Sequence, residues 1–260
     1  MMKKLTFFQK VRGGLGVCLI GCSLLLAVPA SAAGGFEEPL NAFNGNLFYA
    51  SDGWENGDDF GVGWRANNIE FNSGIMALRL DKSGCPSRCS GEQYASGEYA
   101  TIGEDYGYGR VEARMKVAKG EGLVTSLFTY YDLNPDPDIE ENDEIDIEIL
   151  GKDPTKLETN YYTAGDGDHS TVIKLGFDAS LDFHDYAFEW SPTSIKWYVD
   201  GKLVHTETGT PEDLPSHPGS IMVNFWAGAG EAAETWTGEF VYPGSPVRAY
   251  YDWIKYTPAK

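Results

Sequence analysis

The sequence is poor in cysteine and in positive charge, and both shortages restrict its function. Four cysteines occur in 260 residues, and 20 Lys and Arg stand against 39 Asp and Glu, for a formal net charge of −19. A nucleic-acid-binding protein needs a basic face for the phosphates, and an anionic membrane or polysaccharide would be repelled. The composition therefore predicts a neutral partner and no nucleic acid.

Long hydrophobic runs are also absent, apart from one near the N-terminus. Four basic residues there precede an apolar stretch at 17–28 and an Ala-Ser-Ala pattern at 30–32. That order is typical of a secretory signal peptide, and the stretch is shorter than the roughly 20 residues that a membrane-spanning helix needs. We expect residues 1–32 to be removed and the mature protein to be secreted, with its formal charge lowered from −19 to −23.

A lipoprotein signal is the alternative for this leader. Cys22 follows Leu19-Ile20-Gly21 and would then be acylated and keep the protein at a membrane. The residues after Cys22 stay apolar and run into an ordinary cleavage site, which favours release. About 228 residues then remain, enough for one domain over 33–260 and too few for two. We expect that domain to be monomeric.

Two cysteines, Cys85 and Cys89, survive removal of the leader. Because extracytoplasmic compartments are oxidising, this pair predicts a disulfide that closes a small loop. Half of a zinc site is the alternative, but no further Cys or His has suitable spacing. The four histidines show no metal-ligand pattern, and no serine-nucleophile, phosphate-loop or dinucleotide motif occurs. We expect no cofactor for catalysis.

Strand signals, by contrast, run through the whole mature sequence. The chain holds 15 Tyr, 13 Phe, 7 Trp and 31 Gly, and residues 110–117 alternate apolar and charged side chains. Asp200-Gly201 between two β-rich segments, 195–199 and 202–206, predicts a hairpin. Further strands are predicted at 186–190, 221–226 and 250–256. No mature segment keeps a helical period over three turns, so the expected fold is an all-β, two-sheet antiparallel sandwich of the jelly-roll kind.

The most informative strand follows a proline-containing acidic stretch, 132–143, which we interpret as a solvated loop. That stretch lacks the ligand spacing of a calcium-binding loop. In the strand itself, Glu144, Asp146 and Glu148 alternate with isoleucines. The acids should therefore share one face while the isoleucines enter the core. Because like charges repel, a solvated face gains nothing from holding three of them.

Such a row fits a retaining glycosidase, which needs two carboxyl groups about 5–5.5 Å apart, one to attack and one to protonate the leaving oxygen. The Cα atoms of Glu144 and Glu148 lie roughly 13 Å apart in a flat strand, so the side chains must lean over Asp146. Asp146 can then hydrogen-bond Glu144 and help to keep the two glutamates in opposite protonation states. From the pattern alone, an acidic solvent face or a cation site stays open.

Five further segments carry an independent signal, at 150–153, 160–163, 175–180, 196–201 and 251–256. With the carboxylate strand, they resemble glycoside hydrolase family 16, in particular its bacterial licheninase (endo-β-1,3-1,4-glucanase) branch. The resemblance spans about residue 36 to residue 256. It implies a curved sandwich with a concave substrate cleft, in which Glu144 is the nucleophile, Asp146 its helper and Glu148 the general acid/base. The strand also lacks the residue that laminarinases and agarases commonly insert before the last glutamate.

The resemblance implies a β-glucan substrate, because sugar rings stack on aromatic side chains and sugar hydroxyls bind amides and carboxylates. The implied substrate-binding positions are Trp54, Asn56, Glu98, Tyr130, Asn160, Tyr162, Asn224, Trp226 and Trp236. We expect Trp226, Asn224 and Glu98 above all to contact the sugar chain. It also implies a structural calcium, held by backbone carbonyls and one carboxylate near Pro39, Gly74 and Asp252.

The chain departs from the family at several positions. The disulfide usual in licheninases would fall at Val62 and Ser96, and the 85–89 loop could substitute for it. An arginine common two residues after Glu98 is Ala100 here, and an aromatic residue common before the active strand is Asn142. These changes leave the expected chemistry intact and bear on which glucan is cleaved.

We therefore expect an endo-acting, retaining enzyme that hydrolyses β-1,4 bonds in mixed-linkage β-1,3-1,4-glucan (lichenan). The alternatives are an endoglycanase of a bacterial exopolysaccharide such as succinoglycan, a transglycosylase of the same family, and a non-catalytic carbohydrate-binding module. The intact Glu144 and Glu148 weigh against the binding module, because a binder has no reason to hold two repelling acids. A panel of defined substrates would separate the others.

Overall fold

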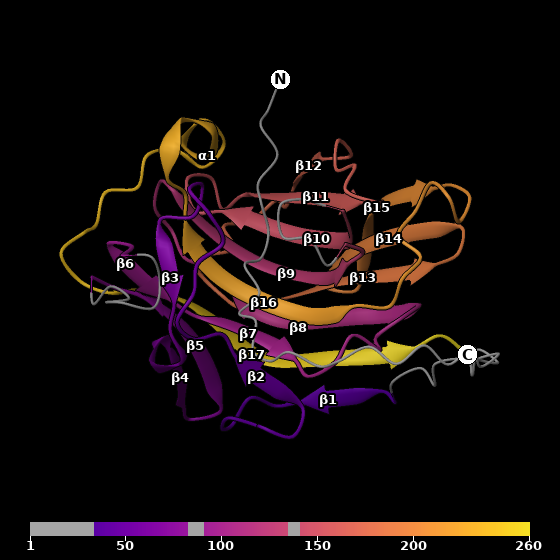
Figure 1. Ribbon diagram of the computed structural model, residues 1–260, viewed down its shortest axis with the longest axis horizontal. Helices are drawn as coiled ribbons and strands as arrows, with labels where there is room; N and C mark the ends of the chain where they lie inside the picture. The colour runs from indigo at the N-terminus through magenta and orange to yellow at the C-terminus, as the bar shows by residue number, and fades with distance from the viewer. Residues whose placement is uncertain (1–33, 83–90, 135–140) are drawn as a thin grey trace, which may run out of the picture.

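The computed structural model describes residues 34–82, 91–134 and 141–260. The expected signal peptide at 1–32, with Cys22, and the expected Cys85–Cys89 disulfide lie outside these residues. Regular structure in the described part is almost entirely β-strand (Figure 1). Within those ranges, no helix combines the length and the hydrophobicity of a membrane span.

Two antiparallel sheets pack face to face, which confirms the predicted jelly-roll sandwich. The eight-stranded sheet has the order β15-β14-β13-β8-β17-β5-β4, with β1 also paired to β17. Its strands are β1 Phe36–Glu38, β4 Ile69–Asn72, β5 Ile75–Leu80, β8 Gly109–Lys116, β13 His184–Ser191, β14 Ser194–Val199, β15 Lys202–Thr208 and β17 Val247–Pro258. The seven-stranded sheet has the order β12-β11-β10-β9-β16-β7-β2. Its strands are β2 Phe48–Ala50, β7 Glu98–Thr101, β9 Leu123–Asp132, β10 Asn142–Leu150, β11 Lys156–Tyr162, β12 Thr171–Lys174 and β16 Ser220–Ala227.

Four short elements complete the described fold. Strands β3 Val62–Trp64 and β6 Tyr94–Ser96 form a small parallel pair, η1 Ala66–Asn68 is a single 3₁₀ turn, and α1 Gly230–Thr237 is an α-helix. Val62 and Ser96, the positions of the disulfide usual in licheninases, thus lie on this parallel pair, where the Ser96 hydroxyl donates to the Phe225 carbonyl. A hydrogen bond across to β16 therefore ties down this pair.

The predicted strands are present, and local chemistry explains them. In β8, Val111, Ala113 and Met115 are buried and alternate with half-buried charged residues. Between β14 and β15, Asp200 and Gly201 both have positive φ, 48° and 73°. A tight hairpin turn of this kind needs positive φ at both positions, which Asp tolerates and Gly adopts freely.

Two expectations about local structure need correction. The stretch 132–143 is not a loop throughout, because Asp132 ends β9 while Asn142 and Asp143 begin β10, and the two strands pair there. Cross-strand pairing overrides the loop-like composition. The helix α1 was also not predicted from the sequence, because its eight residues make too few turns to show a helical period.

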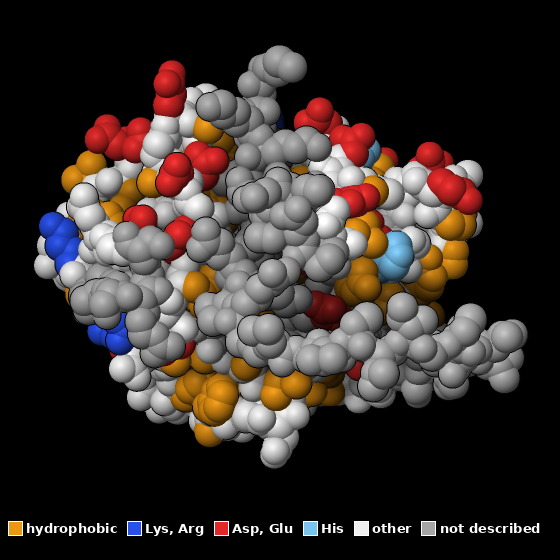
Figure 2. Space-filling view, in the orientation of Figure 1, with side chains coloured by type: hydrophobic (Ala, Val, Ile, Leu, Met, Phe, Trp, Pro, Cys, Tyr) orange, Lys and Arg blue, Asp and Glu red, His pale blue; other side chains and the backbone are white. Residues whose placement is uncertain are grey.

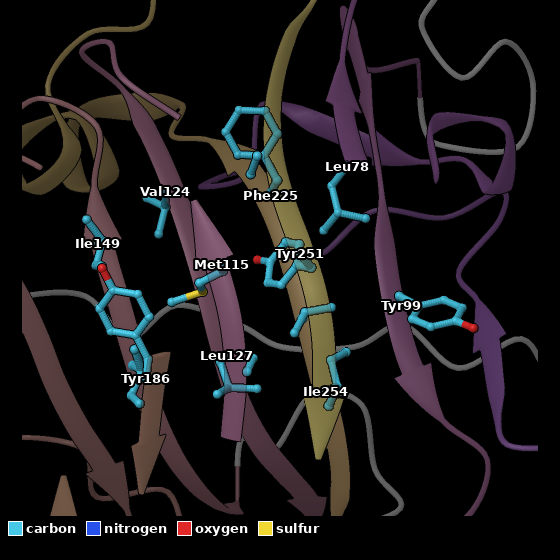
Figure 3. Close-up of a cluster of buried hydrophobic side chains, with 14 of the residues drawn as sticks. Leu78, Tyr99, Met115, Val124, Leu127, Ile149, Tyr186, Phe225, Tyr251 and Ile254 are labelled. Carbon is cyan, nitrogen blue, oxygen red and sulfur yellow. The ribbon is translucent and has the colours of Figure 1, made fainter. Parts of the chain in front are cut away.

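The core lies between the sheets. Met115 and Ile254 from the larger sheet belong to one buried cluster with Leu127 and Ile149 from the smaller one (Figure 3). Ile145, Ile147 and Ile149 are all 0% exposed. β10 is therefore anchored in the core along one side, which fixes the direction of its other side chains.

Candidate active site

β10 carries its three carboxylates on the side of the smaller sheet that faces away from the core. Since the alternate isoleucines are buried between the sheets, Glu144, Asp146 and Glu148 share the opposite side. Asp146 hydrogen-bonds Glu144, so at least these two acids touch. We call this side of the sheet, with its three acids, the carboxylate face.

Strand register arranges neighbouring side chains of the carboxylate face into three rows that cross the sheet. The row through Glu148 contains Asn224, Ser126 and Glu158. The row through Asp146 contains Met222, Phe128 and Asn160. The row through Glu144 contains Ser220, Tyr130 and Tyr162. The predicted residues Tyr130, Asn160, Tyr162 and Asn224 therefore do lie beside the acids.

Two of the acids are held toward their protonated forms. Burial, reinforced by the neighbouring carboxyl groups of Asp146 and Glu158, raises the pKa of Glu148 well above its ordinary value. Burial also raises the pKa of Asp146 well above its ordinary value, together with the charge of Glu144 and the hydrogen bond to it. Asp146 is then the donor in that bond and Glu144 the acceptor. The face thus offers a protonated acid and an acceptor carboxylate, the two states that a glycosidase needs.

Two residues at the start of β10 support this arrangement and were missed in the loop interpretation. Asn142 is 1% exposed, and its Nδ2 donates to Glu144 Oε2 at 2.6 Å. Asp143 is 4% exposed and accepts hydrogen bonds from Ala164 N, Ser216 N, His217 N and His217 Nδ1 at 2.8–3.1 Å. Extending the alternation of β10 by two residues would have placed Asn142 beside Glu144.

Glu98 and Asn224, both expected as sugar contacts, form a buried polar network. Glu98 is 0% exposed and accepts from Ser51 Oγ at 2.7 Å and from Asn224 Nδ2 at 3.3 Å. Ser126 donates to the Asn224 amide oxygen. Burial raises the pKa of Glu98 to about 7, although both hydrogen bonds oppose the rise. Both carboxylate oxygens of Glu98 are thus already engaged within the protein.

The predicted aromatic residues are packed to different degrees. Trp226 is 3% exposed, stacks on Phe60 with ring centroids 4.1 Å apart, and lies 5.9 Å from Trp236. Trp54 is half-buried and meets Trp64 edge to face at 6.4 Å. Trp226 therefore belongs to the packed wall of the site, whereas Trp54 and Trp236 keep exposed surface.

Amide atoms without a partner mark places where a hydroxyl-rich ligand fits. Asn160 Oδ1, Asn142 Oδ1 and Asn56 Nδ2 are buried and have no hydrogen-bond partner among the described residues. The other end of Asn56 accepts from Trp64 Nε1 at 2.7 Å, which fixes its orientation. A buried amide atom left unpaired costs about 1–3 kcal/mol, so a sugar hydroxyl that pairs with it is favoured.

A cavity of about 260 Å³ lies at the β12 side of this face. Leu150, Val172 and Trp236 form its apolar walls, and Lys152 and Glu158 add polar atoms. Trp236 donates from Nε1 to Glu158 Oε2 at 2.9 Å. The cavity therefore continues the carboxylate face along the row that contains Glu148.

The three positions expected to hold calcium lie on and beside β17, a central strand of the larger sheet. Asp252 sits at an irregularity in β17, after Tyr251 pairs with Met76 of β5 and before Ile254 pairs with Glu38 of β1. Pro39 directly follows β1, and Gly74 lies two residues before Met76, so the register brings all three together. Asp252 Oδ2 is 3.4 Å from Arg114 Nε, and Arg114 also pairs with Asp185 at 2.8 Å.

All four histidines form hydrogen bonds. His169 contacts the Tyr161 carbonyl, His184 contacts Asp200, His205 contacts Glu207, and His217 contacts Asp143. In the described ranges, no cluster of three or more His, Cys, Asp or Glu side chains is arranged to hold a metal ion.

Comparison with known proteins agrees with this geometry. The family model for Glycosyl hydrolases family 16 matches residues 56–255. A β-glucanase from Paenibacillus polymyxa is 45% identical over 258 residues, which covers 99% of each chain. The solved β-glucanase of Bacillus licheniformis has a TM-score of 0.77 at 43% identity and covers 88% of this chain and 100% of its own. A solved β-1,3-1,4-glucanase (lichenase) from a mouse hindgut metagenome has a TM-score of 0.77 at 42% identity, with 87% and 100% covered. The chain is a glycoside hydrolase and belongs to glycosyl hydrolases family 16.

Proposed function

We propose that this enzyme is a secreted endo-β-1,3-1,4-glucanase that cleaves β-1,4 bonds of mixed-linkage glucan with retention of configuration. One observation carries the proposal: Glu144, Asp146 and Glu148 share one face of β10, and Asp146 donates to Glu144. The similar proteins are β-glucanases, among them a lichenase, which supports the choice of glucan. The acidic surface suits a neutral polymer, because it would repel an anionic one. On the side of the molecule that Figure 2 shows, Asp and Glu side chains gather in the upper part and Lys and Arg at the left edge.

In the first step, a Glu144 oxygen attacks the anomeric carbon and forms a covalent glycosyl-enzyme ester. The bond from that carbon to the bridging oxygen breaks, and Glu148 gives its proton to this oxygen, so the shortened chain leaves as an alcohol. The raised pKa of Glu148 keeps that proton available at pH values where an ordinary glutamate has lost it. Asp146 donates to Glu144 and orients it for attack.

In the second step, Glu148 is ionised and takes a proton from a water molecule, whose oxygen attacks the same carbon. The ester breaks, and Glu144 returns to its carboxylate form. Two inversions at one carbon give net retention. Asn142 donates to Glu144 and stabilises the carboxylate that is regenerated.

A structural calcium at Asp252, Pro39 and Gly74 is part of the proposal. The chemistry of these residues suits it, because a carboxylate and backbone carbonyls are oxygen ligands of the kind that calcium takes, and strand pairing sets β1 and β5 on either side of Asp252. Arg114 keeps Asp185 as a partner if calcium takes Asp252. The ion would stabilise the fold and would take no part in the reaction.

Product analysis on lichenan, barley glucan, laminarin and succinoglycan tests the substrate. Internal cleavage of the first two, with products of retained anomeric form by NMR, supports the proposal; cleavage of succinoglycan alone would replace it. Glu144→Gln should still bind glucan while its rate falls by orders of magnitude. Azide should restore turnover of Glu148→Ala and give a glycosyl azide of retained form. Sequencing the N-terminus of the mature protein tests cleavage after residue 32.

A further inference from the structure

A fourth carboxylate, Glu158, faces the proposed general acid from the next strand. Glu158 on β11 is the direct cross-strand partner of Glu148 on β10. Side chains at such positions have Cβ atoms about 4.5–5.5 Å apart and point to the same side of the sheet. Like charges placed directly opposite are destabilising. Packing therefore does not explain why two glutamates stand directly opposite each other here.

Glu158 is held in place by two donors. Trp236 donates from Nε1 to Oε2 at 2.9 Å, and the Ser170 hydroxyl donates to Oε1 at 2.6 Å. Each oxygen of Glu158 thus acts as an acceptor, which is the role of an ionised carboxylate. The charge of Glu158 also contributes to the raised pKa of Glu148. A fixed negative charge opposite Glu148 disfavours its ionisation.

We propose that Glu158 is a positioning residue for catalysis: its fixed charge keeps Glu148 protonated, so that the enzyme retains its general acid to higher pH. The inference rests on the proposed role of Glu148. In this role Glu158 acts through Glu148 and not on the bond itself.

The other groups around Glu148 are consistent with this role. On its own strand, Asp146 and Glu144 share one proton through their hydrogen bond, and of the two only Asp146 contributes to the raised pKa of Glu148. On β9 the partner is Ser126, which is neutral. The nearest lysines by register, Lys152 and Lys156, are engaged by the Trp236 carbonyl and by Asp153. Among the described residues of β11, Glu158 is thus the charged side chain that faces Glu148.

The test is the pH profile of kcat/KM for the wild type and Glu158→Gln. Glutamine keeps the shape and can still accept from Trp236, while the charge is lost. In the wild type, kcat/KM should fall at high pH as Glu148 loses its proton; this fall is the alkaline limb of the profile. Removing a unit charge roughly 6 Å away, at an effective dielectric constant of about 40, should shift that limb to lower pH by about one pH unit. Activity at pH values below the limb should change little.

Two variants separate charge from packing. Ser170→Ala removes a hydrogen bond to Glu158 but keeps its charge, and Glu189→Gln removes an exposed charge on β13 of the other sheet. Both should leave the limb in place. A limb that stays put in Glu158→Gln, or moves equally in either control, overturns the proposal.

A measurement without turnover distinguishes this inference from the function itself. The carboxyl carbon of Glu148 can be titrated by ¹³C NMR in labelled protein, with its signal assigned by its loss in Glu148→Gln. Its midpoint should fall in Glu158→Gln and not in Glu189→Gln. If the wild type cleaves no glucan but this midpoint moves, the proposed function fails while the electrostatic coupling stands. An unmoved midpoint rejects the coupling, whatever the substrate.

Discussion

Replacing Asp143 by alanine tests how the protein holds its carboxylate strand in place. Asp143 precedes the proposed nucleophile and accepts four hydrogen bonds, from Ala164, Ser216 and His217. These donors belong to two segments that flank the site, and the His217 ring also stacks on Tyr131 at 5.2 Å. One carboxylate therefore joins β10 to two neighbouring segments.

The structure sets the size of the effect. A hydrogen bond to a charged group contributes about 1.5–3 kcal/mol, and a buried donor left without a partner costs about 1–3 kcal/mol. Asp143 is 4% exposed, but Ser216 and His217 lie at the surface, where water can replace part of the loss. We therefore expect Asp143→Ala to lower the free energy of unfolding by about 2–4 kcal/mol. For a domain of this size that is a fall in Tm of roughly 5–15 °C.

Thermal unfolding followed by circular dichroism measures this change, and Asp213→Ala is the matched control. Asp213 also accepts two hydrogen bonds, from Thr210 N and Oγ1, but in an exposed turn where water can replace it, so its loss should leave Tm nearly unchanged. Below both transitions, Asp143→Ala should also lose about tenfold in kcat/KM, because Glu144 is less well placed. Equal Tm changes in the two variants would refute the reasoning.

Three further predictions follow from the same contacts. Asn142→Leu should lower kcat/KM by about ten- to a hundredfold with little change in Tm, because the charge-assisted bond to Glu144 is lost; unchanged kinetics would count against it. Millimolar calcium added after dialysis against EDTA should raise Tm by several degrees, and Asp252→Asn should abolish most of that rise; a rise that persists in the variant places the ion elsewhere. Burial raises the pKa of Glu98 to about 7 in the folded protein, from an ordinary value of 4.5, so this group makes unfolding easier as pH rises between those two values. In Glu98→Gln the fall in Tm between these pH values should be smaller than in the wild type.

Local patterns predicted much of the fold and the centre of the site. The alternation of Glu144, Asp146 and Glu148 with isoleucines gave the correct facing of β10, because side chains of a strand with one buried side can alternate only one way. The Asp200-Gly201 turn gave the β14–β15 hairpin for a similar reason, since its two positive φ angles depend on those two residues.

Contacts that depend on long-range register could not be predicted in this way. To predict that Glu158 faces Glu148, one must know how β11 pairs with β10. A shift of one residue in that register would have turned Glu158 to the other side of the sheet. Asp143 did carry a signal, because a carboxylate on the core-facing side of a strand must find donors. Its partners come from about 20 and 70 residues further along the chain, so their identity could not be read locally.

The core side of the smaller sheet also explains how the row of carboxylates is held in place. Trp197 of the larger sheet crosses the core and donates from Nε1 to the Asp146 carbonyl at 3.0 Å. Tyr251, also of the larger sheet, donates to the Ser126 carbonyl at 2.9 Å. Apolar packing alone resists slippage of a strand only weakly, because dispersion is non-directional, whereas these two bonds specify positions. They meet the backbone at Asp146 and at the β9 partner of Glu148, directly behind the proposed acids. The larger sheet therefore sets the depth and register of the carboxylate row as well as covering the core.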